Sequence, residues 1–338
     1  TTGTGNTALG RSALDANTSA SNNTAVGSNA LGANTTGAEN TASGKQALTV
    51  NTTGANNTAH GSRALGSNTT ASYNTAVGTD ALLLNTTGAS NVAVGALALD
   101  ANTTGAGNIG IGVSALGANT TAGEGTGVGD GCLAANTTGA LNTAFGAQTL
   151  AACTTGSANV AIGGYALNDL TTGAENVAVG ATALDANTTG ADNTAVGYAS
   201  LGANTTGGNL VAVGKGALES NTTANDNVAV GLRALNANTT GAANTAMGRD
   251  ALYVNTTGLN NTAVGAFALD ANTEGLRNTA LGYNAGSGVT NGDDNVMIGE
   301  AAGNHAVVTT TGNQNTLIGV QTRADSVSSG QTVAIGYD

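Results

Sequence analysis

Apolar and polar residues follow one another along this chain in a pattern that repeats every 17 residues. Residues 23–39, NTAVGSNALGANTTGAE, show it most clearly, and copies begin at 20 places between Asn6 and Thr332. With Asn23 as position 1 of its copy, position 5 is glycine in all 20 copies, position 1 is asparagine in 17, and position 9 is leucine in the first 16. Such a short, regular period predicts a solenoid, in which every repeat is one coil packed against its neighbours.

Two segments of the repeat have the composition of strands. Positions 1 to 5, Asn-Thr/Val-Ala-Val-Gly, are rich in β-branched residues, and Ala-Leu at positions 8 and 9 begins a second extended stretch. Asn-Thr-Thr-Gly at positions 12 to 15 supplies a turn, because Asn and Thr side chains bond their own backbone and Gly accepts a positive φ. The pattern predicts an all-β chain, a parallel β-solenoid (β-roll) of about 20 coils, each with two strands and two corners.

A strand of this repeat is apolar on both faces. Position 3 is Ala or Gly in the first 16 copies, while position 4 is usually Val, Leu, Ile, Phe or Met. Because successive strand residues point to opposite sides, one face packs inside the coil and the other must pack against something else. In so thin a chain the simplest partner is another copy, so we expect self-association. The pattern leaves open which face is which.

Three columns of the repeat are candidate structural residues. We attribute the invariant glycine at position 5 to a backbone corner, or to a close approach of two chain segments where a Cβ does not fit. The asparagine at position 1 and the leucine at position 9 form the other two columns. The representative residues are Gly27, Gly180 and Gly265 at position 5, Asn23 and Asn193 at position 1, and Leu31 and Leu184 at position 9.

The pattern divides the chain into a regular array, residues 1–277, and a variant segment, residues 278–338. In the variant segment Gly286 and Gly303 replace the position-9 leucine, and one coil grows to 20 residues. Terminal coils of solenoids are commonly atypical because they adapt to a cap or to the next domain. We expect this segment to lead into a further domain, and the chain to be part of a longer protein.

The composition limits the core and the partners. Only 8% of the residues are charged and 2% aromatic, with 53 glycines and no proline or tryptophan, so the interior must be thin. Apolar residues held at fixed positions over 16 copies argue against disorder. The net charge of −12 argues against nucleic acid and against membrane contact by this segment. No run approaches the roughly 18 apolar residues of a membrane-spanning helix, and no signal peptide is visible.

The sequence contains no catalytic, cofactor-binding or metal-binding constellation, so we predict no enzyme activity. The two histidines, His60 and His305, are far apart in sequence. The glycine-rich residues 125–131 lack the Lys-Ser/Thr of a nucleotide-binding loop, and calcium-binding β-rolls need an Asp in nearly every turn. Cys132 and Cys153 occupy different positions of neighbouring coils, so we expect isolated buried residues rather than a disulfide or a zinc site.

The Asn-Thr-Thr triplets support more than one interpretation. The N-glycosylation acceptor pattern begins at Asn22, Asn34, Asn51, Asn102 and Asn238. Turn geometry and asparagine ladders between adjacent coils explain the same regularity. The threonine at position 13, present in the first 16 copies, forms a column with about 4.8 Å between neighbours, and flat threonine arrays can bind ice. Because the two threonines are consecutive and lie at a corner, ice binding is an alternative rather than the preferred function.

The strand units resemble a known class of fibre repeats. Asn91–Gly95 (NVAVG) and Asn159–Gly163 (NVAIG) look like the head repeats of trimeric autotransporter adhesins of the YadA type. Asn261–Gly275 is also similar to repeats of bacteriophage tail-fibre proteins that carry a C-terminal endosialidase-type chaperone. The resemblance covers residues 6–336, although the 17-residue period is longer than that of the usual adhesin-head repeat. It implies a homotrimer of parallel β-rolls that forms a stiff surface fibre.

These observations together predict a non-catalytic fibre segment without a cofactor. We expect a shaft or adhesive stalk on a virion or a bacterial cell surface, and therefore an extracellular protein. Two alternatives stay open: an adhesin head that binds a host or matrix ligand, and an ice-binding β-solenoid. The sequence identifies neither a cell-surface ligand nor the source.

Overall fold

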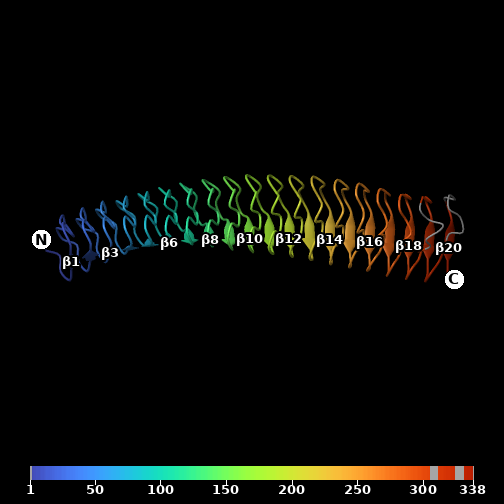
Figure 1. The fold of residues 1–338 in the computed structure, drawn as a ribbon, viewed down its shortest axis with the longest axis horizontal. Helices are drawn as coiled ribbons and strands as arrows, with labels where there is room; N and C mark the ends of the chain where they lie inside the picture. Colours follow the sequence, from blue (N-terminus) through green and yellow to red (C-terminus); the bar gives the residue numbers. More distant parts are fainter. Residues whose placement is uncertain (1, 305–310, 324–330, 338) are drawn as a thin grey trace. The chain divides into compact units, whose positions relative to one another are not determined.

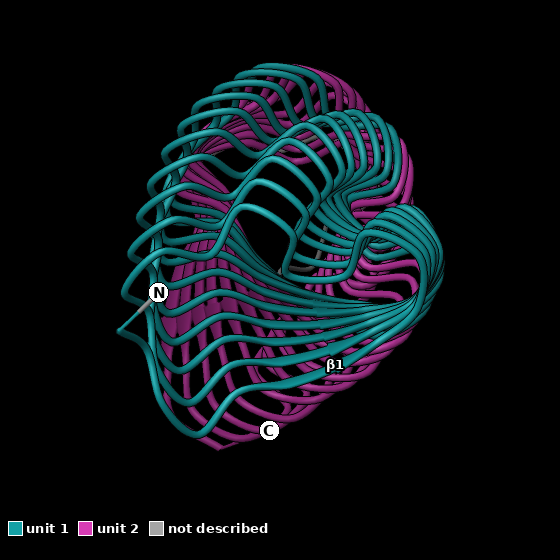
Figure 2. Ribbon diagram, turned by 90° about the vertical axis from the view of Figure 1, so that its left-hand side faces the viewer, with its two compact units in different colours: residues 1–172 teal, residues 173–338 magenta. Residues whose placement is uncertain are grey.

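The computed structural model describes residues 2–304, 311–323 and 331–337. It contains two compact units, residues 1–172 (unit 1) and residues 173–338 (unit 2), coloured separately in Figure 2. Each unit is a stack of coils that follows the 17-residue period, and every coil carries one strand at positions 2 to 4. The predicted fold class, an all-β parallel solenoid, is confirmed.

Ten strands of three residues follow one another in each unit (Figure 1). Unit 1 contains β1 (Thr7–Leu9), β2 (Thr24–Val26), β3 (Thr41–Ser43), β4 (Thr58–His60), β5 (Thr75–Val77), β6 (Val92–Val94), β7 (Ile109–Ile111), β8 (Thr126–Val128), β9 (Thr143–Phe145) and β10 (Val160–Ile162). Unit 2 contains β11 (Val177–Val179), β12 (Thr194–Val196), β13 (Val211–Val213), β14 (Val228–Val230), β15 (Thr245–Met247), β16 (Thr262–Val264), β17 (Thr279–Leu281), β18 (Val296–Ile298), β19 (Thr316–Ile318) and β20 (Val333–Ile335). Within a unit each strand pairs in parallel with the next, and equal positions face each other, as Thr24 faces Thr41.

The coil contains one strand rather than the two that we predicted. Positions 8 and 9 lie in a turn, and the position-9 leucine has a left-handed backbone, with φ of 49° at Leu31 and 54° at Leu184. This conformation costs about 1–2 kcal/mol for a residue with a Cβ, so propensity gives no hint of it. The turn directs the leucine side chain into the coil, where both residues are fully buried. Burying a leucine contributes roughly 1.5–3 kcal/mol, which offsets the backbone cost.

The interior of each coil is filled by small side chains and one leucine. Position 3 is a buried alanine or glycine in every strand from β2 to β17, and position 8 is a buried small residue in the same coils. Backbone bonds join the coils even where no strand forms, as the Leu31 N–H donates to the Ala47 carbonyl at 3.0 Å. The interior is accordingly as thin as the low content of large side chains predicts.

The variant coils of unit 2 keep the coil geometry, but a smaller side chain in one coil is matched by a larger side chain in the next. Gly286 takes the place of the position-9 leucine, and a Cβ built on it would lie 2.9 Å from the Cε of Met297. Met297 and Leu317 hold position 3 of β18 and β19, where earlier strands have alanine or glycine, and both are buried. A larger residue at position 3 therefore fills the space that the missing leucine leaves, which keeps the interior close-packed.

Candidate functional site

The glycine column at position 5 lies where consecutive coils touch. Gly27, Gly180 and Gly265 have φ of 133°, 140° and 135°, a conformation that side chains rarely adopt. A Cβ on Gly180 would lie 2.5 Å from the carbonyl oxygen of Gly197, the equivalent glycine of the next coil. The corresponding carbonyl also stands over Gly27 and Gly265. Position 5 is thus a close approach of two backbones that leaves no room for a side chain.

The asparagine at position 1 is buried and links each coil to the next. The side-chain oxygen of Asn23 accepts a hydrogen bond from the backbone N–H of Asn40 at 2.9 Å. The side-chain oxygen of Asn193 likewise accepts from the N–H of Leu210 at 3.0 Å. Because these N–H groups lie inside the coil, away from water, the bonds satisfy donors that would otherwise cost stability.

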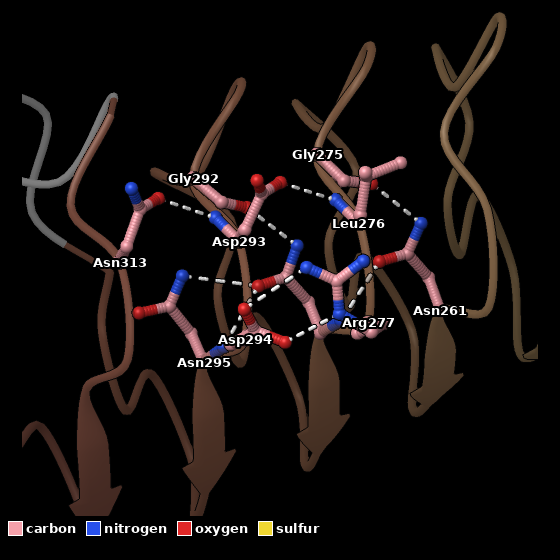
Figure 3. Close-up of polar contacts among 10 residues, drawn as sticks. Asn261, Gly275, Leu276, Arg277, Gly292, Asp293, Asp294, Asn295 and Asn313 are labelled. Atoms are coloured by element: carbon pink, nitrogen blue, oxygen red, sulfur yellow. Dashed lines mark hydrogen bonds and ion pairs between the residues drawn. The ribbon is translucent and has the colours of Figure 1, made fainter.

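A second buried asparagine column, at position 12, forms a ladder. The Asn51 amide donates to the side-chain oxygen of Asn34 and to the carbonyl of Gly54, both at 2.9 Å. The Gly54 carbonyl also accepts from the position-1 amide of Asn40 at 2.9 Å, so the two asparagine columns meet at position 15. Figure 3 shows the position-1 part of this network in unit 2, where the Asn261 amide donates to the Gly275 carbonyl at 2.7 Å.

The position-12 ladder is interrupted where another residue replaces asparagine. In unit 1 the column reads Cys153 and Leu170 after Asn136, and in unit 2 it reads Val289 after Asn272. The side-chain oxygens of Asn136 and Asn272 are buried and have no hydrogen-bond partner. Each run of the ladder therefore ends on an acceptor that the next coil leaves without a donor.

Burial of position 12 bears on the glycosylation interpretation of the Asn-Thr-Thr triplets. Asn34, Asn51, Asn102 and Asn238 are fully buried, and their amides are hydrogen-bonded within the coil. A glycan cannot be attached to these amides in the folded chain. Asn22, at position 17 of its copy, is exposed.

The structure assigns the two faces of the strand. In β11 Ala178 at position 3 is buried, while Val177 and Val179 at positions 2 and 4 are half-buried on the other side. In β2 the same holds, with Ala25 fully buried and Val26 36% exposed. Position 3 therefore faces the coil interior. We call the outward side chains at positions 2 and 4 the outer sheet face.

Exposed apolar side chains gather on this face and beside it. Every exposed large hydrophobic residue among the described residues, except Val50 and Leu84, lies at position 2 or 4 or at the adjoining positions 6, 7, 16 and 17. Phe145, Met247 and Leu281 at position 4 are 49%, 45% and 48% exposed. Scattered exposed apolar residues are normal on a protein, but a contiguous exposed patch marks an interaction surface.

Charged residues flank the outer sheet face on both sides. We call positions 6 and 7, which follow the strand, the C-terminal flank, and positions 16 and 17, which precede it, the N-terminal flank. On the C-terminal flank Arg233 pairs with Asp250 at 2.9 Å, and Lys215 lies 5.7 Å from the ring centre of Tyr198. On the N-terminal flank Arg277 pairs with Asp294 at 2.6 Å (Figure 3). The hydrogen bond from Arg277 holds the pKa of the Asp294 carboxyl below the usual range of an aspartate.

The two threonine columns differ in what their hydroxyls do. At position 13 the Thr35 hydroxyl donates to the Thr52 carbonyl of the next coil at 3.0 Å, and the column repeats this bond. Position 14 is exposed threonine in consecutive coils of each unit, as at Thr53 and Thr206. The position-13 hydroxyls, which were candidates for ice binding, thus donate their hydrogen bonds to backbone carbonyls. The threonines that expose their side chains to solvent are those at position 14.

The histidines and cysteines, the remaining candidates for catalysis or metal binding, form no common site among the described residues. His60 is exposed at position 4 of β4, and His305 lies outside the described residues. Cys132 and Cys153 are buried and free, as predicted, and desolvation by burial raises the pKa of their thiols to about 12 and about 11. In the described part of the chain no three His, Cys, Asp or Glu residues group as metal ligands.

Grooves follow positions 7 to 11 on the outside of the coils. One of these grooves, in unit 2, has a volume of about 590 Å³. It is lined by residues that include Asp185, Gly202, Glu219 and Asn236. The Glu219 carboxylate accepts a hydrogen bond from the Asn236 amide at 2.8 Å.

Comparison with known proteins returned no family model and no curated protein that matches this chain. Among the described residues no helix has the length and apolar character needed to cross a membrane.

Proposed function

We propose that this chain is a segment of a non-catalytic surface fibre, a shaft in which three copies associate through their outer sheet faces. The observation that carries the proposal is the concentration of exposed apolar side chains on that face and its two flanks. Among the described residues these side chains are exposed rather than covered by another element. Burial of such side chains is the usual driving force for association, at roughly 25 cal/mol per Å². A trimer agrees with the resemblance to trimeric fibre repeats.

The contacts between coils support a mechanical role. Within each unit the strands of neighbouring coils pair, the asparagine at position 1 bonds the next coil except where Gly125 and Leu210 replace it, and the threonine hydroxyl at position 13 adds a bond in the regular coils. These bonds run along the stacking direction and recur from coil to coil along each unit. A chain built in this way suits a spacer on a virion or bacterial surface, outside the cell.

The proposal is tested by the mass of the purified chain in solution. We expect light scattering to give about three times the chain mass of 32.1 kDa. Val196→Asp combined with Val230→Asp places charge on the outer sheet face and should reduce the mass to that of one chain, with an unchanged β-type circular dichroism spectrum. Thr206→Asp with Thr240→Asp, at position 14 of the same two coils as Val196 and Val230, is the matched control and should remain trimeric. A stable monomer formed by the unmodified chain would contradict the proposal.

Ice binding remains a second candidate because of the exposed position-14 threonines. Their hydroxyls and methyls repeat at the spacing of the coils, about 4.8 Å, but they form a single row in each unit. An ice binder should produce thermal hysteresis that disappears when Thr189, Thr206 and Thr223 are changed to lysine. A shaft should produce none before or after the change.

The adhesin-head alternative differs from the shaft only in a ligand bound from the side. Binding of the assembled chain to intact cells or matrix, measured against the position-14 lysine variant and the outer-face variant, would favour a head over a shaft.

A further inference from the structure

One asparagine of this chain is followed directly by glycine. The sequence Asn-Gly occurs once, at Asn291–Gly292, where the asparagine takes position 14, which is threonine in most copies. Asparagine loses its side-chain amide most readily before glycine, because glycine has no Cβ that keeps its backbone nitrogen away from the amide carbon. The repeat itself requires a small residue here, since position 15 is glycine or alanine in all of the first 17 copies.

We propose that Asn291 is a site of spontaneous deamidation in the folded chain, promoted by the hydroxyl of Thr273, with water as the co-reactant. The backbone nitrogen of Gly292 gives its proton to a solvent base and attacks the Cγ of Asn291. The C–N bond of the side-chain amide breaks, ammonia leaves, and a succinimide ring remains. Water then opens the ring at either carbonyl and leaves an aspartyl or an isoaspartyl residue. Water is consumed and ammonia released, without an oxidant or a reductant.

The oxygen of the Asn291 side chain accepts a hydrogen bond from a hydroxyl. The Thr273 hydroxyl lies 2.7 Å from this oxygen, and 3.3 Å from the Thr290 carbonyl oxygen that its place in the column predicts as partner. In a regular coil the same hydroxyl donates to the backbone at 3.0 Å, as at Thr35. A donor on the amide oxygen stabilises the negative charge that develops there when the Gly292 nitrogen adds to the carbon.

The corner of the β17 coil also has fewer bonds than the corner before it. The Gly275 carbonyl accepts from the asparagine amides at positions 1 and 12 of its coil, at 2.7 and 3.2 Å. The equivalent carbonyl of Gly292, also drawn in Figure 3, keeps the position-1 bond, from Asn278 at 2.7 Å. Position 12 is here Val289, which has no amide to donate.

This missing bond affects how often the corner opens. Gly292 is buried, so its N–H meets a solvent base only when the corner opens locally. A corner with one bond fewer opens more often, and opening also allows the rotation that brings the Gly292 nitrogen to the side chain of Asn291. Asn291 itself is exposed, so that water can enter and ammonia can leave.

The two products differ in their effect on the coil. An aspartyl residue adds a negative charge close in sequence to Asp293 and Asp294. An isoaspartyl residue adds a carbon to the backbone beside Gly292, where the Gly312 carbonyl oxygen of the next coil already occupies the space of a Cβ. Deamidation would therefore change charge and packing with age in the first coil of the variant segment. Position 14 belongs neither to the outer sheet face nor to its flanks, so this inference does not rest on the proposed function.

Peptide mapping by mass spectrometry tests the site in the folded chain, incubated in mildly alkaline buffer. We expect the peptide that contains Asn291 to gain the mass of an amide-to-acid exchange and to become a substrate of protein isoaspartyl methyltransferase. The rate should rise with pH, because the attacking nitrogen must lose its proton. Three exposed asparagines that precede other residues, Asn22, Asn225 and Asn260, are internal controls and should keep their amides.

Two variants separate the contributions of the asparagine and the hydroxyl. Asn291→Thr restores the residue of the regular copies and should abolish the mass change, with an unchanged circular dichroism spectrum. Thr273→Val removes the donor and should slow the loss of the amide about two- to tenfold, the factor that one hydrogen bond contributes. Thr256→Val, one coil earlier in the same column, is the matched control and should leave the rate unchanged.

Loss of the Asn291 amide in the folded chain, slowed in Thr273→Val alone, supports the inference. Retention of the amide in the folded chain, under conditions in which the urea-unfolded chain loses it, would overturn the inference because the fold then protects the site. An equal rate at Asn22 or Asn225, or an equal rate in Thr273→Val and the parent, would overturn it as well. The proposed function is tested separately by the mass of the assembled chain and is unaffected by these outcomes.

Discussion

Replacement of Gly180 by alanine probes the contact on which the stacking of coils depends. At φ of 140° the added side chain strains the backbone, at a cost of about 1–3 kcal/mol. Its Cβ would also lie 2.5 Å from the Gly197 carbonyl oxygen, whereas ordinary contact begins at 3.4 Å. The two coils must separate locally, which weakens the 2.8 Å bond from the Gly197 N–H to the Val179 carbonyl. Loss of that bond adds ~1 kcal/mol, so we expect a destabilisation of about 2–4 kcal/mol per chain.

Gly202→Ala is the matched control for this change. Gly202 lies at position 10, has no left-handed φ, and would place its Cβ 3.4 Å from the Ala199 carbonyl oxygen, within ordinary contact. Alanine at such a site stabilises a protein by about 0.4–1 kcal/mol, because the unfolded chain loses freedom. Both variants are compared with the parent by urea unfolding and by amide hydrogen exchange. Exchange is needed because a solenoid can open locally at one coil.

The expected pattern is specific to position 5. Exchange in Gly180→Ala should accelerate in the coils of β11 and β12, and its urea midpoint should fall, while Gly202→Ala should match or exceed the parent. Equal midpoints and equal exchange in the two variants would refute the explanation of the invariant glycine by close approach.

Three more tests probe side chains that lie wholly or partly inside the coil. Asn51→Ala removes a rung of the position-12 ladder and leaves a buried oxygen without a donor, so it should lower the free energy of unfolding by about 2–4 kcal/mol. The control Thr53→Ala, at an exposed position, should change the free energy of unfolding by less than about 0.5 kcal/mol. Urea unfolding measures both. Desolvation raises the pKa of Asp270 above its usual 3.8, so the folded chain holds this proton more tightly than the unfolded chain, and stability falls as the pH rises through that window. Asp270→Asn should therefore raise the melting temperature at neutral pH, and the gain should vanish at acidic pH. Cys132 and Cys153, whose raised pKa values keep them as thiols, should resist alkylation at pH ~8 in the native chain and react fully in urea, as mass spectrometry would show.

The coil and its glycines could be predicted from the sequence because the residues that form them recur at the period of the repeat. Position 5 shows no exception in 20 copies, and a backbone contact that excludes Cβ requires that invariance. The thin core follows in the same way from the small residues at positions 3 and 8. Nothing comparable marks a ligand, since an outward surface tolerates many residues and one sequence offers no relatives for comparison.

The second strand was a wrong prediction for a physical reason. Leu31 and its equivalents adopt a left-handed backbone that leucine rarely takes, and local preference cannot anticipate a conformation that only burial stabilises. The orientation of the strand faces was likewise open, because Ala25 and Val26 are both apolar. The meeting of Asn40 and Asn51 at the Gly54 carbonyl was missed as well. Its signal was present, because both asparagine columns recur at the period of the repeat.

The exchange of volume between Gly286 and Met297 determines how the array can change in length. A regular coil contributes its own leucine and its own small residue at position 3, so one such coil can replace or follow another without disturbing the interior. Gly286 instead depends on a residue that the next coil supplies. Insertion of a regular coil between the two would leave a void on one side and a crowded methionine on the other. Gains and losses of coils by recombination are thus expected within the regular array, while the coils of β17 and β18 are inherited as one block.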